Sequence, residues 1–143
     1  MAKEDDEKCE VLHSHSFYDP RKKWMSETET DEYKYPIVYT INSQNEIKHR
    51  YSSENKGHIG IKKLMWSNGR IKSIGSVIDK EGKYGLTCFA YGIVDEEENL
   101  DNIKKAFDSY NFRRLMEYCA VGQLTVNFKI IALFKKDFWK EFI

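Results

Sequence analysis

The sequence predicts an α+β fold, with a mostly antiparallel β-sheet of five to seven strands and two short helices near positions 97–119. Two observations lead to this class. Short β-branched and aromatic runs alternate with turn signals from position 35 to position 94, which is typical of strands joined by hairpins. Two stretches with apolar residues at i, i+3 and i+7 then follow, which is the spacing of amphipathic helices.

Five segments carry the strand prediction. The first two, YPIVYTI and IKHRYS, flank the polar turn NSQNE and therefore favour a hairpin. The turn SNG joins the third segment to the fourth, and DKEGK joins the fourth to the fifth. The segments are 35–41, 47–52, 61–66, 71–78 and 84–94. Together they predict a meander.

Both helices are predicted from apolar spacing and end signals. The acidic cluster at 95–99 suits a first helical turn, because carboxylates are stabilised at the positive end of a helix. Asp108-Ser109 is a cap signal for the second helix, which ends before Gly122. The apolar run 124–134 is predicted to be a further strand. The apolar helix positions are Leu100, Ile103 and Phe107, then Phe112, Leu115, Met116 and Cys119.

Length and composition indicate one folded domain. The chain has 143 residues, of which 41% are apolar and 14% aromatic, which is enough to bury a core. Residues 1–33 are polar and lack an apolar period, so we expect a partly mobile lead-in, with a single domain over 34–143. Three cysteines are too few for a disulfide framework, and the sequence shows no signal peptide or membrane span. We therefore expect a cytoplasmic protein.

The zero formal net charge is a cancellation between segments. Residues 34–91 carry ten Lys or Arg against four Asp or Glu, a net charge of +6. Residues 1–33 have a net charge of −5 and residues 92–110 of −4, while residues 111–143 have +3. A basic region of this kind is compatible with a nucleic-acid partner even in a neutral chain.

Motifs for catalysis are sparse. The Asn/Asp-Pro-Pro-Tyr/Phe loop of adenine-N6 methyltransferases cannot form, since the only prolines are Pro20 and Pro36. Asp79 with Glu81-x-Lys83 matches half of a metal-dependent nuclease motif, but DKEGK is better interpreted as a hairpin turn. Cys9, His13 and His15 lack a second ligand pair for zinc. We expect no metal, no cofactor and no catalytic residue.

The basic positions alternate with aromatic residues and glycines. Lys48 and Arg50 share one face of their strand, as Arg70 and Lys72 share a face of theirs, while Lys62 and Lys63 point to opposite faces. Cations in a groove bind phosphates, and Trp or Asn at a loop tip can stack on bases or read their edges. The predicted nucleic-acid contacts are Lys48, Arg50, Lys56, Lys62, Lys63, Trp66, Asn68, Arg70, Lys72 and Lys83.

Three motifs over residues 34–142 resemble the C-terminal target-recognition domain of adenine-N6 DNA methyltransferases and their fused restriction enzymes. Gly60-Ile61-Lys62-Lys63 is similar to the family's Gly-Ile-Pro-Lys strand, and Asp79…Gly82…Tyr84-Gly85 to its Asp-x-x-Gly-x-Tyr-Gly turn. Asp108-Ser109…Phe112 is similar to its Asn-Ser…Phe helix junction. Lys62 stands where the family has Pro, and Asp108 where it has Asn.

The resemblance implies a specificity module of a restriction-modification system. Such a module would bind double-stranded DNA with the face and loops of its small sheet, and would serve a methyltransferase or endonuclease catalytic domain or subunit. Two other functions stay open. One is a small Mg²⁺-dependent nuclease that uses Asp79, Glu81 and Lys83. The other is an interaction or inhibitor protein whose acidic residues 95–101 occupy the DNA groove of another protein.

Overall fold

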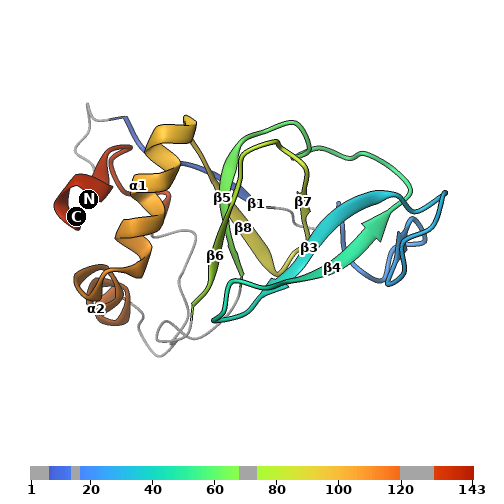
Figure 1. The fold of residues 1–143 in the computed structure, drawn as a ribbon, viewed down its shortest axis with the longest axis horizontal. Coiled ribbons are helices and arrows are strands. Elements are labelled where there is room, and N and C mark those ends of the chain that lie inside the picture. The colour runs from blue at the N-terminus through green and yellow to red at the C-terminus, as the bar shows by residue number, and fades with distance from the viewer. Residues whose placement is uncertain (1–6, 14–16, 68–73, 120–130) are drawn as a thin grey trace.

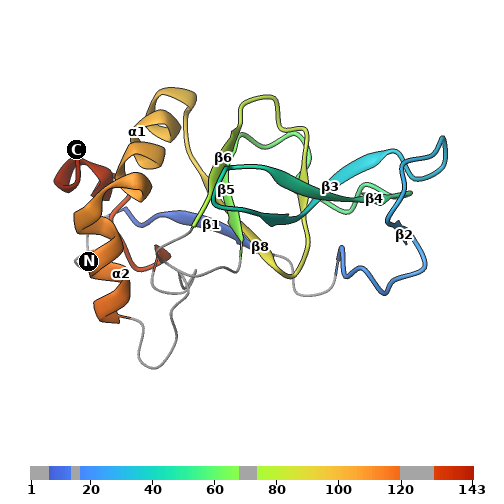
Figure 2. The same ribbon diagram turned by 60° about the horizontal axis from the view of Figure 1, so that its bottom comes forward.

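The computed structural model describes residues 7–13, 17–67, 74–119 and 131–143. Within these ranges eight strands form two four-stranded sheets, and the helices lie at one end of the molecule, beyond the first sheet (Figures 1 and 2). The strands are β1 (Glu10–His13), β2 (Met25–Ser26), β3 (Tyr35–Ile41), β4 (Ile47–Ser52), β5 (Lys63–Ser67), β6 (Ser76–Asp79), β7 (Gly85–Leu86) and β8 (Ala90–Val94). The helices are α1 (Glu97–Asp108), α2 (Tyr110–Cys119) and a 3₁₀ helix at Phe138–Glu141. No helix in these ranges is long and apolar enough to cross a membrane.

The first sheet has the order β1-β8-β5-β6 and is antiparallel. The second has the order β2-β4-β3-β7, in which only the β3–β7 pair is parallel. The predicted α+β class, with mainly antiparallel strands and two helices in the C-terminal half, is confirmed. The strands form two sheets rather than one meander, because a turn splits the predicted segment 84–94. In that turn the amide of Ala90 donates to the carbonyl of Thr87 at 3.2 Å, and β7 and β8 join different sheets.

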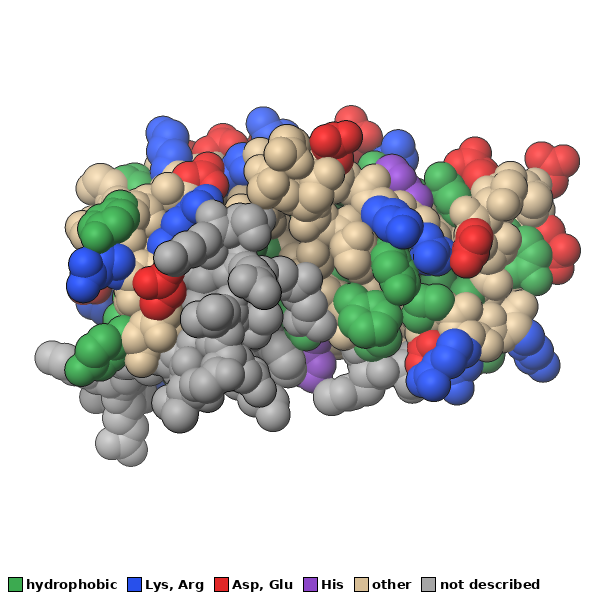
Figure 3. All heavy atoms as spheres, turned by 90° about the horizontal axis from the view of Figure 1, so that it is seen from below, with side chains coloured by type: hydrophobic (Ala, Val, Ile, Leu, Met, Phe, Trp, Pro, Cys, Tyr) green, Lys and Arg blue, Asp and Glu red, His purple; other side chains and the backbone are tan. Residues whose placement is uncertain are grey.

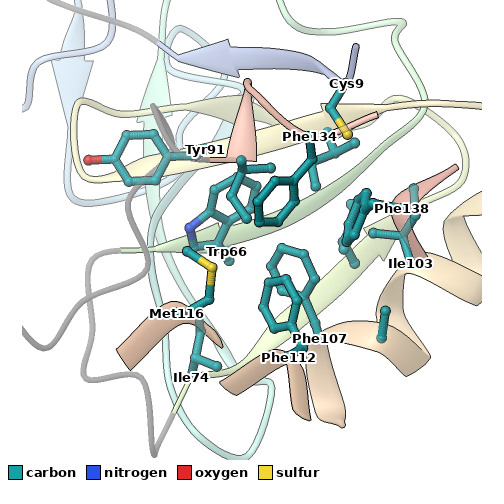
Figure 4. Close-up of a cluster of buried hydrophobic side chains, with 14 of the residues drawn as sticks. Cys9, Trp66, Ile74, Tyr91, Ile103, Phe107, Phe112, Met116, Phe134 and Phe138 are labelled. Carbon is teal, nitrogen blue, oxygen red and sulfur yellow. The ribbon is translucent and has the colours of Figure 1, made fainter. Parts of the chain in front are cut away.

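The larger core lies between the first sheet and the helices (Figure 4). Trp66 of β5 packs edge-on against Phe107 of α1, with ring centroids 5.4 Å apart. Phe107 in turn stacks on Phe112 of α2 at 4.6 Å. Aromatic pairs of this kind add to the stabilisation from area burial. Further members of this core are Leu64, Ile93, Leu100, Ile103, Met116, Phe134 and Phe138.

A smaller core fills the space between the two sheets. It is formed by Val38 and Ile41 of β3, Met65 of β5, Leu86 and Ala90. Strand β5 is therefore buried on both faces, because Leu64 and Trp66 face the helices while Met65 faces the second sheet. This double burial explains why the three central residues of β5, Leu64, Met65 and Trp66, are all apolar instead of alternating with polar residues.

The N-terminal segment contributes to both sheets. Strand β1 pairs with β8, and β2 pairs with β4. The fully buried Tyr18 accepts a hydrogen bond from the amide of Lys56 at 2.7 Å and donates one to the carbonyl of Gly57 at 2.8 Å. The predicted domain boundary at residue 34 therefore does not coincide with the edge of the fold.

Two other predicted boundaries change. Strand β5 begins at Lys63 instead of residue 61, because His58 and Gly60 have φ values of +65° and +91° and turn the chain just before it. Most of the predicted strand 124–134 lies outside the described residues. In its described part Ile131 is helical and the next residues form a turn, with a 3.0 Å hydrogen bond from the amide of Phe134 to the carbonyl of Ile131, so the strand prediction is wrong for 131–134.

Gly82 provides a test of the packing between two turns. Its φ is +66°, and a Cβ atom placed there would lie 2.6 Å from the carbonyl carbon of Gly60. We expect Gly82→Ala to lower the free energy of unfolding by about 2–4 kcal/mol, from the left-handed backbone and the clash together. Urea denaturation measures this change.

Gly57→Ala is the matched control, because Gly57 also has a positive φ, +117°, but its Cβ would meet no atom within 4 Å. We expect this control to cost only the backbone strain, about 1–2 kcal/mol. Equal losses in the two variants would show that the close approach of Gly82 to Gly60 does not matter.

Candidate nucleic-acid interface

Lys63 is the centre of a buried polar cluster and does not reach the surface. Its side chain is fully buried and that of Asp79 is 2% exposed. The ammonium donates to Asp79 Oδ2 at 2.8 Å and to the carbonyls of His58 and Ile61 at 3.1 Å each, so all three of its protons are satisfied. The prediction that Lys63 binds phosphate is therefore wrong for this conformation.

Asp79 is equally occupied. Its Oδ1 accepts the amide hydrogen of Lys83 at 2.8 Å, and its Oδ2 accepts that of Tyr84 at 2.9 Å as well as the Lys63 proton. The carboxylate thus closes the turn between β6 and β7. Glu81 and Lys83 are exposed on this turn. Asp79, Glu81 and Lys83 line one shallow pocket at this turn, but the Asp79 side chain is only 2% exposed and its carboxylate is already bonded to Lys63 and to two turn amides. The predicted turn with Gly82 at a positive φ is present, although it joins strands of different sheets and is therefore not a hairpin.

His58 completes the cluster. Its ring is buried between the rings of Phe17 and Tyr18, and its Nδ1 accepts the amide hydrogen of Leu86 at 3.3 Å. Burial lowers the pKa of His58 to about 4, and the positive charge of Lys63 adds to this effect. We call Lys63, Asp79 and His58 the Lys63 cluster.

Trp66 is also interior. It is fully buried, with its ring 5.6 Å from that of Tyr91 and its Nε1 without a hydrogen-bond partner. The reason is strand alternation, since position 66 faces the helices in the doubly covered strand β5. The predicted base contact by Trp66 is therefore wrong. Asn68, Arg70 and Lys72 lie outside the described residues.

Lys48 and Arg50 do share one face of β4, as predicted, and both lie over Tyr39 of β3. The Arg50 guanidinium carbon is 4.1 Å and the Lys48 ammonium 5.7 Å from the centroid of the Tyr39 ring. A register shift between Val38 and Thr40 places Tyr39 in this position. Phe89, 38% exposed, packs edge-on against Tyr39 at 5.4 Å. We call Tyr39, Lys48, Arg50 and Phe89 the β3–β4 patch.

Arg50 is incompletely paired. Its Nη1 donates to the carbonyl of His49 at 3.0 Å, whereas its Nη2 lies 3.8 Å from Glu27, whose side chain is 83% exposed. Its Nε has no hydrogen-bond partner. The Arg50 side chain itself is 14% exposed, and an ion pair of this length to a mostly exposed carboxylate contributes little. Figure 3 shows blue basic and green hydrophobic side chains next to each other over the end of the molecule that holds β3 and β4.

The other predicted cations, Lys56, Lys62 and Lys83, contact residues outside the β3–β4 patch. The Lys56 ammonium lies 4.3 Å from the centre of the Trp24 ring and pairs with Glu54 at 2.8 Å. Lys62 lies 3.9 Å from Glu97, at the start of α1. Lys83 lies 5.5 Å from the ring of its neighbour Tyr84. The seven predicted contacts that lie within the described residues thus do not form one continuous groove.

Cys9, considered as a zinc ligand, is buried, and its thiol donates to the carbonyl of Lys135 at 3.4 Å. Burial raises the pKa of Cys9 to about 12, so the thiolate that zinc requires is disfavoured. His15 lies outside the described residues. Within the described ranges, no three His, Cys, Asp or Glu side chains are grouped as metal ligands would be.

Tyr39 and Phe89 were missed by the sequence interpretation. Cross-strand pairing of 35–41 with 47–52 was predicted, but in the observed register Lys48 lies opposite Thr40 and Arg50 opposite Ile37. The register shift at Tyr39 was not predictable from the pairing, because the local pattern is equally compatible with a regular ladder.

Comparison with known proteins finds no matching family model, no similar curated protein and no similar solved structure.

The Lys63–Asp79 pair should show strong coupling in a double-mutant cycle. Lys63→Met leaves a buried carboxylate without its counter-charge, which costs about 3–5 kcal/mol of unfolding free energy. Adding Asp79→Asn removes that charge while keeping an oxygen for a turn amide, so the double variant should be more stable than the sum of the single losses predicts. Urea denaturation measures all three variants, and additive losses would contradict the buried ion pair.

His58 should make the fold sensitive to mild acid. Its folded pKa, about 4, lies below the ordinary 6.5, so the unfolded chain binds a proton first as the pH falls. The contribution to stability is complete above pH 6.5 and is lost between pH 6.5 and 4, up to about 3 kcal/mol. His58→Asn removes the titration, tolerates the positive φ and keeps an acceptor for Leu86. Its unfolding free energy should change less over this range; parallel pH profiles would exclude His58 as the cause.

Proposed function

We propose that this chain is a duplex-DNA-binding module of a restriction-modification system, and that the β3–β4 patch contacts the phosphate backbone. In this role it supplies target specificity to a separate catalytic domain. Two things support the proposal. The first is the resemblance of residues 34–142 to target-recognition domains. The second, which carries most weight, is the arrangement of Arg50 over Tyr39.

The Tyr39 ring holds the Arg50 guanidinium in place before any ligand binds. A guanidinium 4.1 Å above a ring gains cation–π stabilisation. A side chain ordered in this way loses less entropy when it binds a phosphate. Nη2, which lies 3.8 Å from the exposed carboxylate of Glu27, is the group best suited to exchange that carboxylate for a phosphate oxygen.

Lys48 and Phe89 extend the same surface. Lys48 is exposed and two residues from Arg50 on β4, so it can neutralise a neighbouring phosphate. Phe89 gives an exposed apolar contact of the kind that packs against sugars or a thymine methyl group. Lys56 and Lys83 are exposed cations that can contribute to the general attraction for DNA.

The acidic segment 95–101 gives less support for a DNA-mimicking inhibitor. Glu97, within this segment, lies 3.9 Å from Lys62 and 3.7 Å from Lys80, so part of its negative charge is balanced inside the chain. Asp95 Oδ1 accepts hydrogen bonds from the amide of Glu96 at 2.7 Å and from the side-chain amide of Asn99 at 3.0 Å. These contacts are those of a helix start.

Salt-dependent binding to a mixed-sequence DNA duplex tests the proposal. Lys48→Gln and Arg50→Gln should each weaken binding and flatten the slope of log K against log salt by about 1, because each removes one phosphate contact. Tyr39→Leu keeps the charge and should weaken binding with the slope unchanged. Fluorescence anisotropy at several salt concentrations gives both quantities.

Lys80→Gln is the matched control. Lys80 is exposed beside Glu97, outside the β3–β4 patch, and its substitution removes the same single positive charge. It should leave the slope nearly as in the unaltered chain. Absence of duplex binding at low salt would overturn the proposed function. Binding that Lys48→Gln and Arg50→Gln leave unchanged would show that another surface is used.

A further inference from the structure

Helix α2 presents an unusual outer face. Tyr110 and Tyr118 are 70% and 90% exposed, and Arg114, also exposed, lies between them at the spacing of successive helical turns. Phe112 and Met116 bury the opposite face in the core. We call Tyr110, Arg114 and Tyr118 the α2 stripe. Arg113 and Glu117 line the same shallow hollow.

The α2 stripe is rich in hydrogen-bond donors. Arg114 Nη1 donates to the hydroxyl of Tyr110 at 2.9 Å, and its guanidinium carbon lies 5.7 Å from that ring. One such bond leaves most of the guanidinium N–H groups directed to solvent. The Tyr118 hydroxyl is a further exposed donor. Among the described residues Glu117 is the one carboxylate lining the hollow. Of the two arginines that line it, Arg113 lies 3.8 Å from Asp108, so the positive charge offered to a ligand is that of Arg114.

This face does not have the composition of a protein-docking helix. Helices that dock into protein grooves present apolar anchors at i, i+3, i+4 and i+7, whereas the residues between the two tyrosines on this face are charged. Arg and Tyr side chains donate readily to phosphate oxygens and are common backbone contacts in DNA complexes. The charge and the donors are thus complementary to a phosphate backbone.

The position of α2 agrees with this chemistry. Helix α2 lies at the bottom of the molecule in Figure 1, and Figure 3 views the molecule from below. In that view green and blue side chains are visible at the helical end as well as over β3 and β4. Hydrophobic and basic side chains therefore occur at both ends of this face, together with acidic ones.

We propose that the α2 stripe is a second backbone contact for the same DNA duplex, with Arg114 and Tyr118 binding phosphates at some distance from those bound by the β3–β4 patch. This inference rests on the proposed function and adds a contact surface to it. In the unbound protein, Tyr110 holds Arg114 as Tyr39 holds Arg50.

Arg114→Gln, Tyr118→Phe and Tyr118→Ala test the proposal on the full chain, with a mixed-sequence DNA duplex as the probe. Both residues are exposed, so these changes should leave the urea unfolding midpoint unaltered. We expect Arg114→Gln to flatten the salt slope by about 1. Tyr118→Phe and Tyr118→Ala should weaken binding equally, with little change of slope, if the hydroxyl makes the contact.

Combination with Lys48→Gln tests whether the two surfaces act together. Because their contacts are separate, the Lys48→Gln/Arg114→Gln chain should lose about two units of slope. Shortening the duplex stepwise should abolish the effect of one substitution before the other, since a short duplex cannot reach both surfaces. Lys80→Gln is the control for net charge, because it removes one positive charge beside Glu97 at the start of α1, outside the α2 stripe.

Two results would overturn the inference. If Arg114→Gln and Tyr118→Ala behave like Lys80→Gln while Lys48→Gln weakens binding, α2 is outside the interface and the proposed function stands. If Tyr118→Ala leaves DNA binding intact but abolishes a concentration-dependent self-association seen by sedimentation, the stripe is a protein contact. If the unaltered chain does not bind the duplex above background, the proposed function itself is wrong.

Discussion

The buried ion pair between Lys63 and Asp79 constrains much of the fold. Two charges placed between packed sheets cost several kcal/mol each in lost hydration, and only complete pairing offsets this cost. The pairing is complete because the chain before β5 turns its carbonyls inward, with His58 and Gly60 at positive φ. The turn after β6 likewise directs two amides at Asp79. One ammonium therefore fixes two loops at the end of the first sheet.

Because the buried carboxylate of Asp79 needs a counter-charge, one lysine of this region is structural, whereas others are exposed and can bind a ligand. Lys63 and its neighbour Lys62 are adjacent in the sequence, yet one is inside the fold and the other is exposed beside Glu97. Two further cations are arginines that contact tyrosine rings: Arg114, which is exposed, and Arg50, whose side chain is 14% exposed. An arginine placed by an aromatic ring keeps most of its donors and gives up part of its conformational freedom, which suits recognition of a rigid polyanion.

The sequence was informative where local chemistry decides the structure. The hairpin of β3 and β4 matched its predicted bounds, because a five-residue polar turn separates two β-branched runs. Both helices were predicted from the spacing of Leu100, Ile103 and Phe107 and its repeat in α2. The burial of Lys63 and Trp66 was not predictable, since it depends on the helices and the second sheet covering the two faces of β5. The sequence of a strand that contains lysines is the same whether these lysines face water or a buried carboxylate.

Tyr18 has a consequence for how this unit could be moved between proteins. Its hydroxyl bridges the backbone of Lys56 and Gly57, next to the turn that leads into β5, although 38 residues separate it from Lys56 in the chain. Strand β1, upstream of it, supplies one edge of the first sheet. Cutting or fusing the chain at residue 34 would break both connections. A crossover point that keeps the unit intact would thus lie upstream of β1, so that the polar N-terminal segment travels together with the sheets it supports.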